Sequence, residues 1–347
     1  MKILFLINHA AFFSSHRIDL YISAKKFLKA KCLLVIGQGA SKIMEKKAIS
    51  ILKKKKINYK VTKLTSSKNK IVSDIYGLIQ SFQICNKFKP DILHSATPKF
   101  NFIGVILALA LNIRTYVCSV SGMGYLYTNK KISFFEKILK YVNILFFILL
   151  KIKSNKKIIL QNLSDYKFFS KIYSKNCCFL VPSSGIKIEN YKFKINKKKI
   201  VVLPSRLLKD KGVIEFVRSA KNLKQKYPRW SFKLIGARDY DNPSLIDTKI
   251  FEEEINNGDI EIQDYNNSLS QVYKDASIVC LPSHREGFSK VILEAGILKL
   301  PIVASNIPGN KQGIINNKTG ILFKSKNIKD LTNKLEYLIK NKKKEMN

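Results

Sequence analysis

Two glutamates eight residues apart are the side chains whose chemistry is easiest to recognise. Glu286 and Glu294 lie in the segment EGFSKVILE, which follows an apolar run ending at Leu281. The apolar run predicts a buried strand, and a helix is expected to begin near Ser289. A carboxylate that accepts hydrogen bonds from two neighbouring hydroxyls can hold a ribose or a hexose. Because Glu286 precedes the helix and Glu294 lies inside it, we expect them to bind different parts of one ligand.

The loop between this strand and helix also suits a phosphate group. Gly287 allows the backbone to approach a ligand closely, and the N–H groups of Phe288 and Ser289 would lie at the positive end of the helix dipole. The alternative is an ordinary strand–loop–helix unit with two solvated glutamates.

A second strand–helix junction carries two cations. Arg206 and Lys211 stand in SRLLKDKG, between an apolar run over 200–204 and a predicted helix over 212–227. Two fixed cations beside a helix N-terminus would neutralise a diphosphate and the negative charge that grows on it as it leaves. Alone the pattern is weak, because basic residues are common at loop ends. Together with the glutamate pair it indicates a diphosphate ligand.

Short apolar runs alternate with helix-length amphipathic segments along the whole chain. The runs are continuously apolar, which is typical of parallel sheets covered on both faces. The segment 182–199 interrupts the alternation with proline, glycine and a lysine cluster. We therefore predict an α/β fold of two doubly wound Rossmann-like domains facing a cleft. The expected boundaries are 1–182 for the first domain, 183–199 for a linker and 200–347 for the second domain.

The charge of this 347-residue chain is strongly positive and unevenly distributed. It has 63 Lys and Arg against 24 Asp and Glu, a net charge of +39, and 46% of its residues are hydrophobic, which excludes a disordered basic tail. Residues 1–185 contribute +26 of this charge and hold only six acidic residues. A lysine-rich composition alone would not remove acidic residues from one half. We expect the first half to face an anion, although composition bias could explain part of the excess.

The longest apolar stretches, 100–113 and 144–150, are too short to span a membrane, and no signal peptide is evident. Lysines over 130–157 interleave with aliphatic and aromatic residues. This pattern predicts either a cationic amphipathic helix on an anionic bilayer or a domain helix packed on its sheet. The six cysteines have no paired spacing, so reduced, buried thiols are expected.

These motifs, with PIVASNIPGNKQGIINNKTGILF over 301–323, resemble the retaining family 4 glycosyltransferases of GT-B fold. Three further segments are similar to the bacterial branch that builds lipid-linked oligosaccharides, N-acetylgalactosaminyltransferases included: FFSSHR over 12–17, SGMGYLYT over 121–128 and GARDYDNPS over 236–244. The resemblance implies transfer of a hexose or N-acetylhexosamine, with retention, from a UDP-sugar to an undecaprenyl-pyrophosphate-linked oligosaccharide in surface polysaccharide or glycan assembly.

The resemblance also implies roles for individual residues. Arg206 and Lys211 would bind the donor diphosphate, Glu286 the hydroxyls of the transferred sugar, and Glu294 those of the ribose. The backbone over 287–289 would cradle the distal phosphate. Base and ribose would pass the strand end at Gly236 and Arg238.

The family's mid-domain histidine is replaced here by the stretch SVSG over 119–122. The acceptor-side candidates are therefore His16, His94, Ser121 and Gly122. The chain ends shortly after a predicted helix over 328–340, where relatives continue, which puts interdomain clamping in doubt.

No metal or other cofactor is expected, because the two cations would replace a divalent ion. The D-x-D segment at 239–241 is interpreted as a loop after a strand.

The expected partners are a UDP-sugar, a lipid-linked sugar and an anionic membrane surface, with a cytoplasmic, peripheral location on the inner face of the plasma membrane. No nucleic acid is expected, because no RNP-like or helix-turn-helix pattern is present. Two alternatives stay open: a GT-B-type UDP-sugar epimerase and a non-enzymatic, basic nucleic-acid-binding α/β protein. A phosphorylase would need a pyridoxal lysine that the sequence does not identify.

Overall fold

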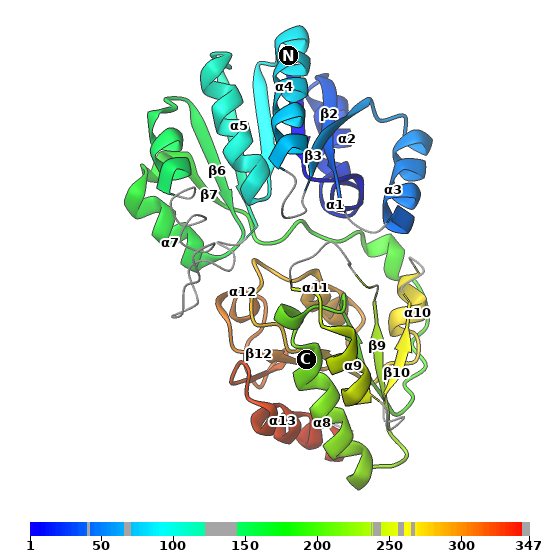
Figure 1. Cartoon of the computed structure of the whole chain (residues 1–347). Helices are drawn as coiled ribbons and strands as arrows, with labels where there is room; N and C mark the ends of the chain where they lie inside the picture. Colours follow the sequence, from blue (N-terminus) through cyan, green and yellow to red (C-terminus); the bar gives the residue numbers. More distant parts are fainter. Residues whose placement is uncertain are drawn as a thin grey trace. The chain divides into compact units, whose positions relative to one another are not determined.

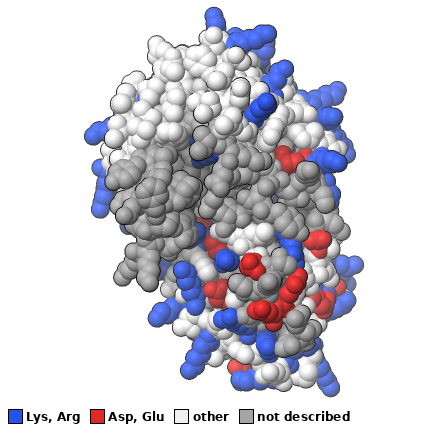
Figure 2. All heavy atoms as spheres, in the orientation of Figure 1, with Lys and Arg blue, Asp and Glu red and all other residues white. Residues whose placement is uncertain are grey.

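The computed structural model describes residues 1–39, 42–65, 71–121, 144–236, 238, 244–255, 260–264 and 268–341. The chain divides into two compact units, with the described residues up to Val181 in the first and those from Pro182 onward in the second (Figure 1). On the face drawn in Figure 2, most of the visible Asp and Glu side chains lie over the second unit, whereas Lys and Arg lie over both. This distribution matches the uneven charge of the sequence.

The first unit is built on a parallel sheet of seven strands in the order β3-β2-β1-β4-β5-β6-β7. Its strands are β1 Lys2–Ile7, β2 Lys31–Gln38, β3 Tyr59–Thr65, β4 Ile92–Ala96, β5 Thr115–Val120, β6 Lys156–Leu160 and β7 Cys178–Leu180. Successive residues of β1 join opposite cores: Leu4 and Leu6 enter one, while Ile3, Phe5 and Ile7 enter the other. Both faces of the sheet are therefore buried, as the continuous apolar runs predict.

Helices cover each face of this sheet. Those packed on one face contribute to the core around Phe5 and those on the other to the core around Leu4. The helices on the Phe5 side are α1 Ala10–His16, α2 Ile18–Phe27 and α3 Lys42–Lys54. The helices on the Leu4 side are α4 Ile71–Phe88, α5 Pro98–Ala110 and α7 Leu163–Ile172. The short 3-10 helix η2 Lys175–Cys177 follows α7. The sequence also predicts a helix over 133–152: residues 144–152 are helical, and the preceding part lies outside the described residues.

The amphipathic pattern over 15–30 predicts a single helix, but this prediction is wrong, because the structure has two helices there, α1 and α2. The first begins earlier, where His9 Nδ1 accepts a hydrogen bond from the Phe12 N–H at 3.1 Å and so caps α1. The backbone then leaves helical geometry at Arg17, whose φ is −133°, before α2 begins. Histidine is not among the preferred N-cap residues, so the sequence carries little signal for this start.

The second unit has a parallel six-stranded sheet in the order β10-β9-β8-β11-β12-β13. The strands are β8 Ile200–Pro204, β9 Ser231–Ile235, β10 Glu261–Gln263, β11 Ile278–Leu281, β12 Ile302–Ser305 and β13 Ile321–Phe323. One face of this sheet is covered by α8 Val213–Lys226, α9 Thr248–Ile255 and α13 Ile328–Lys340. The other face is covered by α10 Leu269–Tyr273 and α11 Lys290–Ile297. The unit also has the short helices η3 Ile188–Tyr191, η4 Lys209–Lys211 and α12 Pro308–Lys311.

The segment expected as a linker packs on the second unit. Tyr191 is buried among the side chains that cover one face of the second sheet, with Phe193 and Ile195 packed against the same core. The functional division of the chain into an acceptor domain and a donor domain stays a prediction.

The strand order of each sheet reverses direction beside its first strand. In the first sheet the reversal lies between β1 and β4, and in the second it lies between β8 and β11. Loops that leave the carboxyl ends of two such strands run to opposite faces of the sheet and leave a crevice between them, where ligands of open α/β sheets bind. The two reversal points are therefore the places to look for sites.

Candidate functional site

The loops after β8 and β11 meet at the reversal point of the second sheet. The two strands pair in parallel, with Val279 opposite Val202, and the His284 N–H donates a hydrogen bond to the Asp210 carbonyl at 2.8 Å. This register brings Lys211 Nζ to 2.7 Å from Glu286 Oε1, although the residues are 75 positions apart. Their side chains are mostly buried, at 22% and 13% exposed. Two residues predicted to share a ligand are thus in direct contact.

The Lys211–Glu286 ion pair leaves hydrogen-bonding capacity on both partners. An ammonium group has three N–H donors and a carboxylate has about four acceptor sites, and the pair uses one of each. A phosphate oxygen could bind to the remaining donors of Lys211 while a hydroxyl donates to Glu286. The arrangement can therefore hold a charged group and a neutral sugar side by side.

Gly212 makes this contact possible. Its φ is +71°, and a Cβ atom there would lie 2.2 Å from the Pro282 carbonyl oxygen. Only glycine meets both requirements at low cost, because other residues are strained at positive φ and would collide with the neighbouring loop. Gly212 therefore lets the loop after β8 approach the loop after β11 closely enough for the ion pair to form.

Glu294, in α11, is held by two tyrosines. The Tyr191 hydroxyl donates to Oε1 at 3.0 Å, and the Tyr273 hydroxyl donates to Oε2 at 2.5 Å. These bonds fix the orientation of the carboxylate and leave it about two further acceptor sites, enough for a vicinal diol. The sequence did not predict either tyrosine. Tyr191 lies in the expected linker, and no motif marks either residue.

The loop from Gly287 to Ser289 leads into α11 as expected. Ser289 is the N-cap residue of α11, but its side chain makes no capping hydrogen bond. Gly309, at the start of α12, lies against the same loop, where a Cβ atom would come within 2.3 Å of the Glu286 carbonyl oxygen. The helix dipole of α11 is thus directed toward the loop that carries Gly287.

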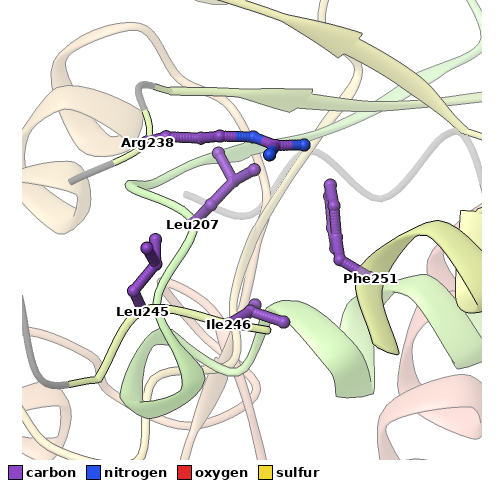
Figure 3. Close-up of a pocket in the computed structure, with 5 residues that line it drawn as sticks. All are labelled: Leu207, Arg238, Leu245, Ile246 and Phe251. Atoms are coloured by element: carbon purple, nitrogen blue, oxygen red, sulfur yellow. The ribbon is translucent and has the colours of Figure 1, made fainter. Parts of the chain in front are cut away.

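The remaining predicted donor residues lie at the ends of β8 and β9. Arg206 is exposed in the loop after β8. Gly236 follows β9, packed so closely that a Cβ atom would lie 1.8 Å from the Ser205 carbonyl oxygen. The Arg238 guanidinium carbon lies 5.9 Å from the centre of the Phe251 ring. Figure 3 shows the small pocket beside them, which is lined by Leu207, Arg238, Leu245, Ile246 and Phe251.

His284 and Glu215 add a contact that the sequence analysis missed. His284 Nε2 lies 2.6 Å from Glu215 Oε1, which ties the loop after β11 to α8. Burial by itself would raise the pKa of Glu215, but the hydrogen bond and charge of His284 outweigh it, so the pKa is lowered. The contact fixes the loop that carries Glu286.

The acceptor-side candidates lie in the first unit. His94 is buried in β4, with Nε2 2.8 Å from Ser119 Oγ; burial, helped by the charge of Arg17, lowers its pKa to about 3, so its imidazole is neutral. The His16 ring stacks on Phe12 with centroids 4.8 Å apart. Ser121 directly follows β5, and its buried hydroxyl has no hydrogen-bond partner. Gly122 lies outside the described residues.

Within the described part of the chain, no three His, Cys, Asp or Glu side chains gather as a metal ion would require. The D-x-D segment at 239–241 lies outside it. The cysteines of the sequence are all free thiols; burial raises the pKa of Cys85 and Cys118 to about 12.

Two family models match the chain. One, described as glycosyl transferase 4-like, covers residues 2–150, and the other, glycosyl transferases group 1, covers residues 187–347. The structure is similar to that of Anabaena HepE in complex with UDP and glucose, with a TM-score of 0.78 at 17% identity, covering 100% of this chain and 92% of that one. TarM gives a TM-score of 0.71 at 14% identity, with coverage of 99% and 92%. The expected fold is confirmed.

Sequence relatives agree with the structural ones. The N,N'-diacetylbacillosaminyl-diphospho-undecaprenol alpha-1,3-N-acetylgalactosaminyltransferase of Campylobacter jejuni is 30% identical over 274 residues, covering 74% of this chain and 70% of the relative. The capsular polysaccharide biosynthesis glycosyltransferase CapM of Staphylococcus aureus is 25% identical over 284 residues, with coverage of 78% and 72%. A UDP-Gal:alpha-D-GlcNAc-diphosphoundecaprenol alpha-1,3-galactosyltransferase of Escherichia coli is 25% identical over 283 residues, with coverage of 76% and 70%. This chain therefore belongs to the family 4 glycosyltransferases of GT-B fold.

Proposed function

We propose that this glycosyltransferase moves a hexose or N-acetylhexosamine from a UDP-sugar to an undecaprenyl-pyrophosphate-linked sugar, with retention, in the assembly of a bacterial surface polysaccharide. The observation that carries the proposal is the Lys211–Glu286 pair at the reversal point of the second sheet. The names of the relatives from C. jejuni and E. coli describe enzymes that transfer N-acetylgalactosamine and galactose to diphosphoundecaprenol-linked acceptors.

In this mechanism the two cations act on the leaving group. Lys211 and Arg206 bind the donor diphosphate and stabilise the charge that it gains as the glycosidic bond breaks. Glu286 accepts a hydroxyl of the transferred sugar and so fixes the anomeric carbon beside the cation. The departing phosphate takes the acceptor proton on the same face of the sugar, so no covalent nucleophile and no metal ion enter the proposal.

The nucleotide is held by the elements around α11. Glu294, oriented by its two tyrosines, accepts the ribose hydroxyls. The backbone at Gly287 and Ser289 binds the distal phosphate at the start of α11. The pocket beside Arg238 in Figure 3 lies at the end of β9, where we place the base.

A lipid-linked acceptor requires the protein to work at a membrane surface. No described helix is long and apolar enough to cross a membrane. One face of α4, however, exposes a series of apolar side chains at helical spacing, between 40% and 68% exposed: Val72, Ile75, Tyr76, Ile79 and Phe82. This face could lie in the interface of an anionic bilayer. We propose a cytoplasmic enzyme, peripheral on the inner face of the plasma membrane; half of the basic segment over 130–157 lies outside the described residues.

The test is a donor screen with an undecaprenyl-pyrophosphate-linked sugar and mass detection of the added unit. Arg206→Ala is expected to lower turnover with bound donor by about 100-fold, as the loss of one charge-stabilising group does, while changing UDP affinity far less. Lys209→Ala removes a neighbouring exposed cation and serves as the control. Near-wild-type turnover of the Arg206 variant, or no transfer from any UDP-sugar, would overturn the assignment.

Two measurements separate the proposed enzyme from the two alternatives. An epimerase would release free sugar from a UDP-sugar without an acceptor. A nucleic-acid-binding protein would be stabilised against thermal unfolding by oligonucleotides, whereas the proposed enzyme is stabilised by UDP.

A further inference from the structure

Arg17 is a buried cation at the reversal point of the first sheet. It lies between α1 and α2, in the segment that connects β1 to β2, and only 7% of the residue is exposed. Its Nη1 donates to the His16 carbonyl at 3.0 Å, and its guanidinium carbon lies 5.6 Å from the centre of the Phe12 ring. Its Nε is buried and has no hydrogen-bond partner. In the part of the chain that the structure describes, no carboxylate pairs with Arg17, and burial alone lowers its pKa to about 10.

Most of the carboxylates that the structure describes in the first unit are hydrogen-bonded to other groups, and Asp19 is exposed. Residues 1–185 contain only six acidic residues. Several of those that the structure describes are hydrogen-bonded elsewhere in the unit: Glu45 to the Ala10 and Ala11 N–H groups, Asp74 to Lys99, Asp91 to the Lys2 N–H and Asp165 to Asn162. A buried charge without a counter-charge costs free energy, and a leucine or methionine there would be cheaper for the fold.

Polar groups without hydrogen-bond partners also lie at the carboxyl edge of the first sheet. β1, β4 and β5 are neighbours, so their carboxyl ends lie together. Asn8 follows β1 and Ser121 follows β5, and each has a buried oxygen without a hydrogen-bond partner: Oδ1 of Asn8 and Oγ of Ser121. His94 in β4 contributes a neutral imidazole, so Arg17 supplies the positive charge at this edge.

We propose that Arg17 binds a phosphate oxygen of the diphosphate in the lipid-linked acceptor. The guanidinium presents a planar fork of five N–H donors that matches phosphate geometry. The inference rests on the proposed function for the identity of the ligand, but the unpartnered Nε and the missing counter-charge stand without it. The donor diphosphate is the other source of phosphate oxygens, and the second unit already provides Lys211 and Arg206 for it.

The test compares Arg17→Gln with Arg114→Gln, which removes an exposed arginine from the same unit. With saturating UDP-sugar, Arg17→Gln is expected to raise the acceptor KM about tenfold or more, as the loss of a charge-assisted contact does. The UDP Kd should stay within about twofold of wild type, since the donor diphosphate binds elsewhere. Arg17→Lys should recover part of the acceptor affinity, and Arg114→Gln should change neither value.

A second measurement does not depend on transfer. Farnesyl diphosphate should raise the melting temperature of the wild type and of Lys211→Ala, but not that of Arg17→Gln. Without ligand, Arg17→Gln should melt at or above the wild-type temperature, because it removes a buried unpaired charge. A marked fall in melting temperature would show a purely structural role and overturn the proposal. A weaker UDP Kd with an unchanged acceptor KM would assign Arg17 to the donor and overturn it equally. If farnesyl diphosphate stabilised the wild type but not Arg17→Gln, and the wild type transferred no sugar, the phosphate site at Arg17 would stand and the proposed transfer reaction would be rejected.

Discussion

Both sheets reverse their strand order beside the first strand, but the cations at the two reversal points have different surroundings. In the second unit Lys211 is paired with Glu286, and both are mostly buried. In the first unit Arg17 is more deeply buried and has no carboxylate partner among the described residues. The charge of a paired cation is already compensated without ligand. When the substrate binds, the cation can bond to its phosphate while the carboxylate accepts a hydrogen bond from its hydroxyl. An unpaired cation is stabilised only when an anion arrives.

This difference matches the two substrates of the proposed reaction. The donor combines a diphosphate with a sugar, so a cation beside a carboxylate addresses both parts at once. For the acceptor diphosphate, a bare guanidinium is sufficient. The same fold thus provides one site whose buried cation is already paired with a carboxylate and one whose buried cation is unpaired until an anion binds.

Removing the Lys211–Glu286 ion pair should have the largest effect on turnover. Lys211→Ala and Glu286→Gln are each expected to lower turnover by about 100- to 1,000-fold, the range measured for single groups that stabilise transition-state charge. Because the two side chains act as one unit, the double variant should lose much less than the product of the single losses. The turnover of the three variants is measured by steady-state kinetics with saturating donor. If the loss in the double variant equalled the product of the two single losses, Lys211 and Glu286 would act independently.

Gly212 tests the backbone requirement of the paired site. Gly212→Ala should lower the free energy of unfolding by about 1–3 kcal/mol, because alanine is strained at φ +71° and meets the Pro282 carbonyl. Urea unfolding measures this. Gly296→Ala is the matched control, since nothing lies within 4 Å of its new Cβ atom and alanine is the better helix residue. Equal stability of the two variants would contradict the role of Gly212.

The lowered pKa of His94 makes the free energy of unfolding depend on pH. Its pKa is lowered from 6.5 to about 3, first by burial and then by the charge of Arg17. Between these values the unfolded chain binds more protons at this side chain than the folded one. The free energy of unfolding should therefore rise with pH across that window, by at most about 1.4 kcal/mol per pH unit.

The measurement is urea unfolding between pH 4 and 8. His94→Asn should flatten the slope over the window, and His16→Gln, at a half-buried site on α1, should leave it nearly unchanged. In the Arg17→Gln variant the slope should be reduced slightly, because Arg17 is the smaller of the two causes. An unchanged slope in His94→Asn would show that other groups dominate.

The sequence predicted the strands and the ligand-bearing loops well, because both depend on local patterns. The apolar run over 200–204 corresponds to β8, and the run that ends at Leu281 corresponds to β11. The distance between Lys211 and Glu286 could not be predicted, because it depends on the register between β8 and β11. The start of α1 was missed because its cap is His9, and Arg17 entered only as part of a motif, since burial without a partner is a property of the folded chain.

Tyr191 and Tyr273 show most clearly that contacts between distant segments cannot be predicted from the sequence. Their variants are expected to have the smallest kinetic effect. No spacing marks them, since they meet only when the segment 182–199 and α10 pack beside α11. Tyr191→Phe and Tyr273→Phe should each raise the KM for UDP-sugar about three- to tenfold, as the loss of one hydrogen bond to a carboxylate does, with little change in kcat. Discrimination between UDP and 2′-deoxy-UDP should weaken in parallel, because the loosened Glu294 faces the ribose in the proposed site. Tyr76→Phe, on the exposed face of α4, is the control. If the tyrosine variants lowered stability without changing this discrimination, Glu294 would be a structural anchor of the second unit, and the ribose would have to be held by other groups.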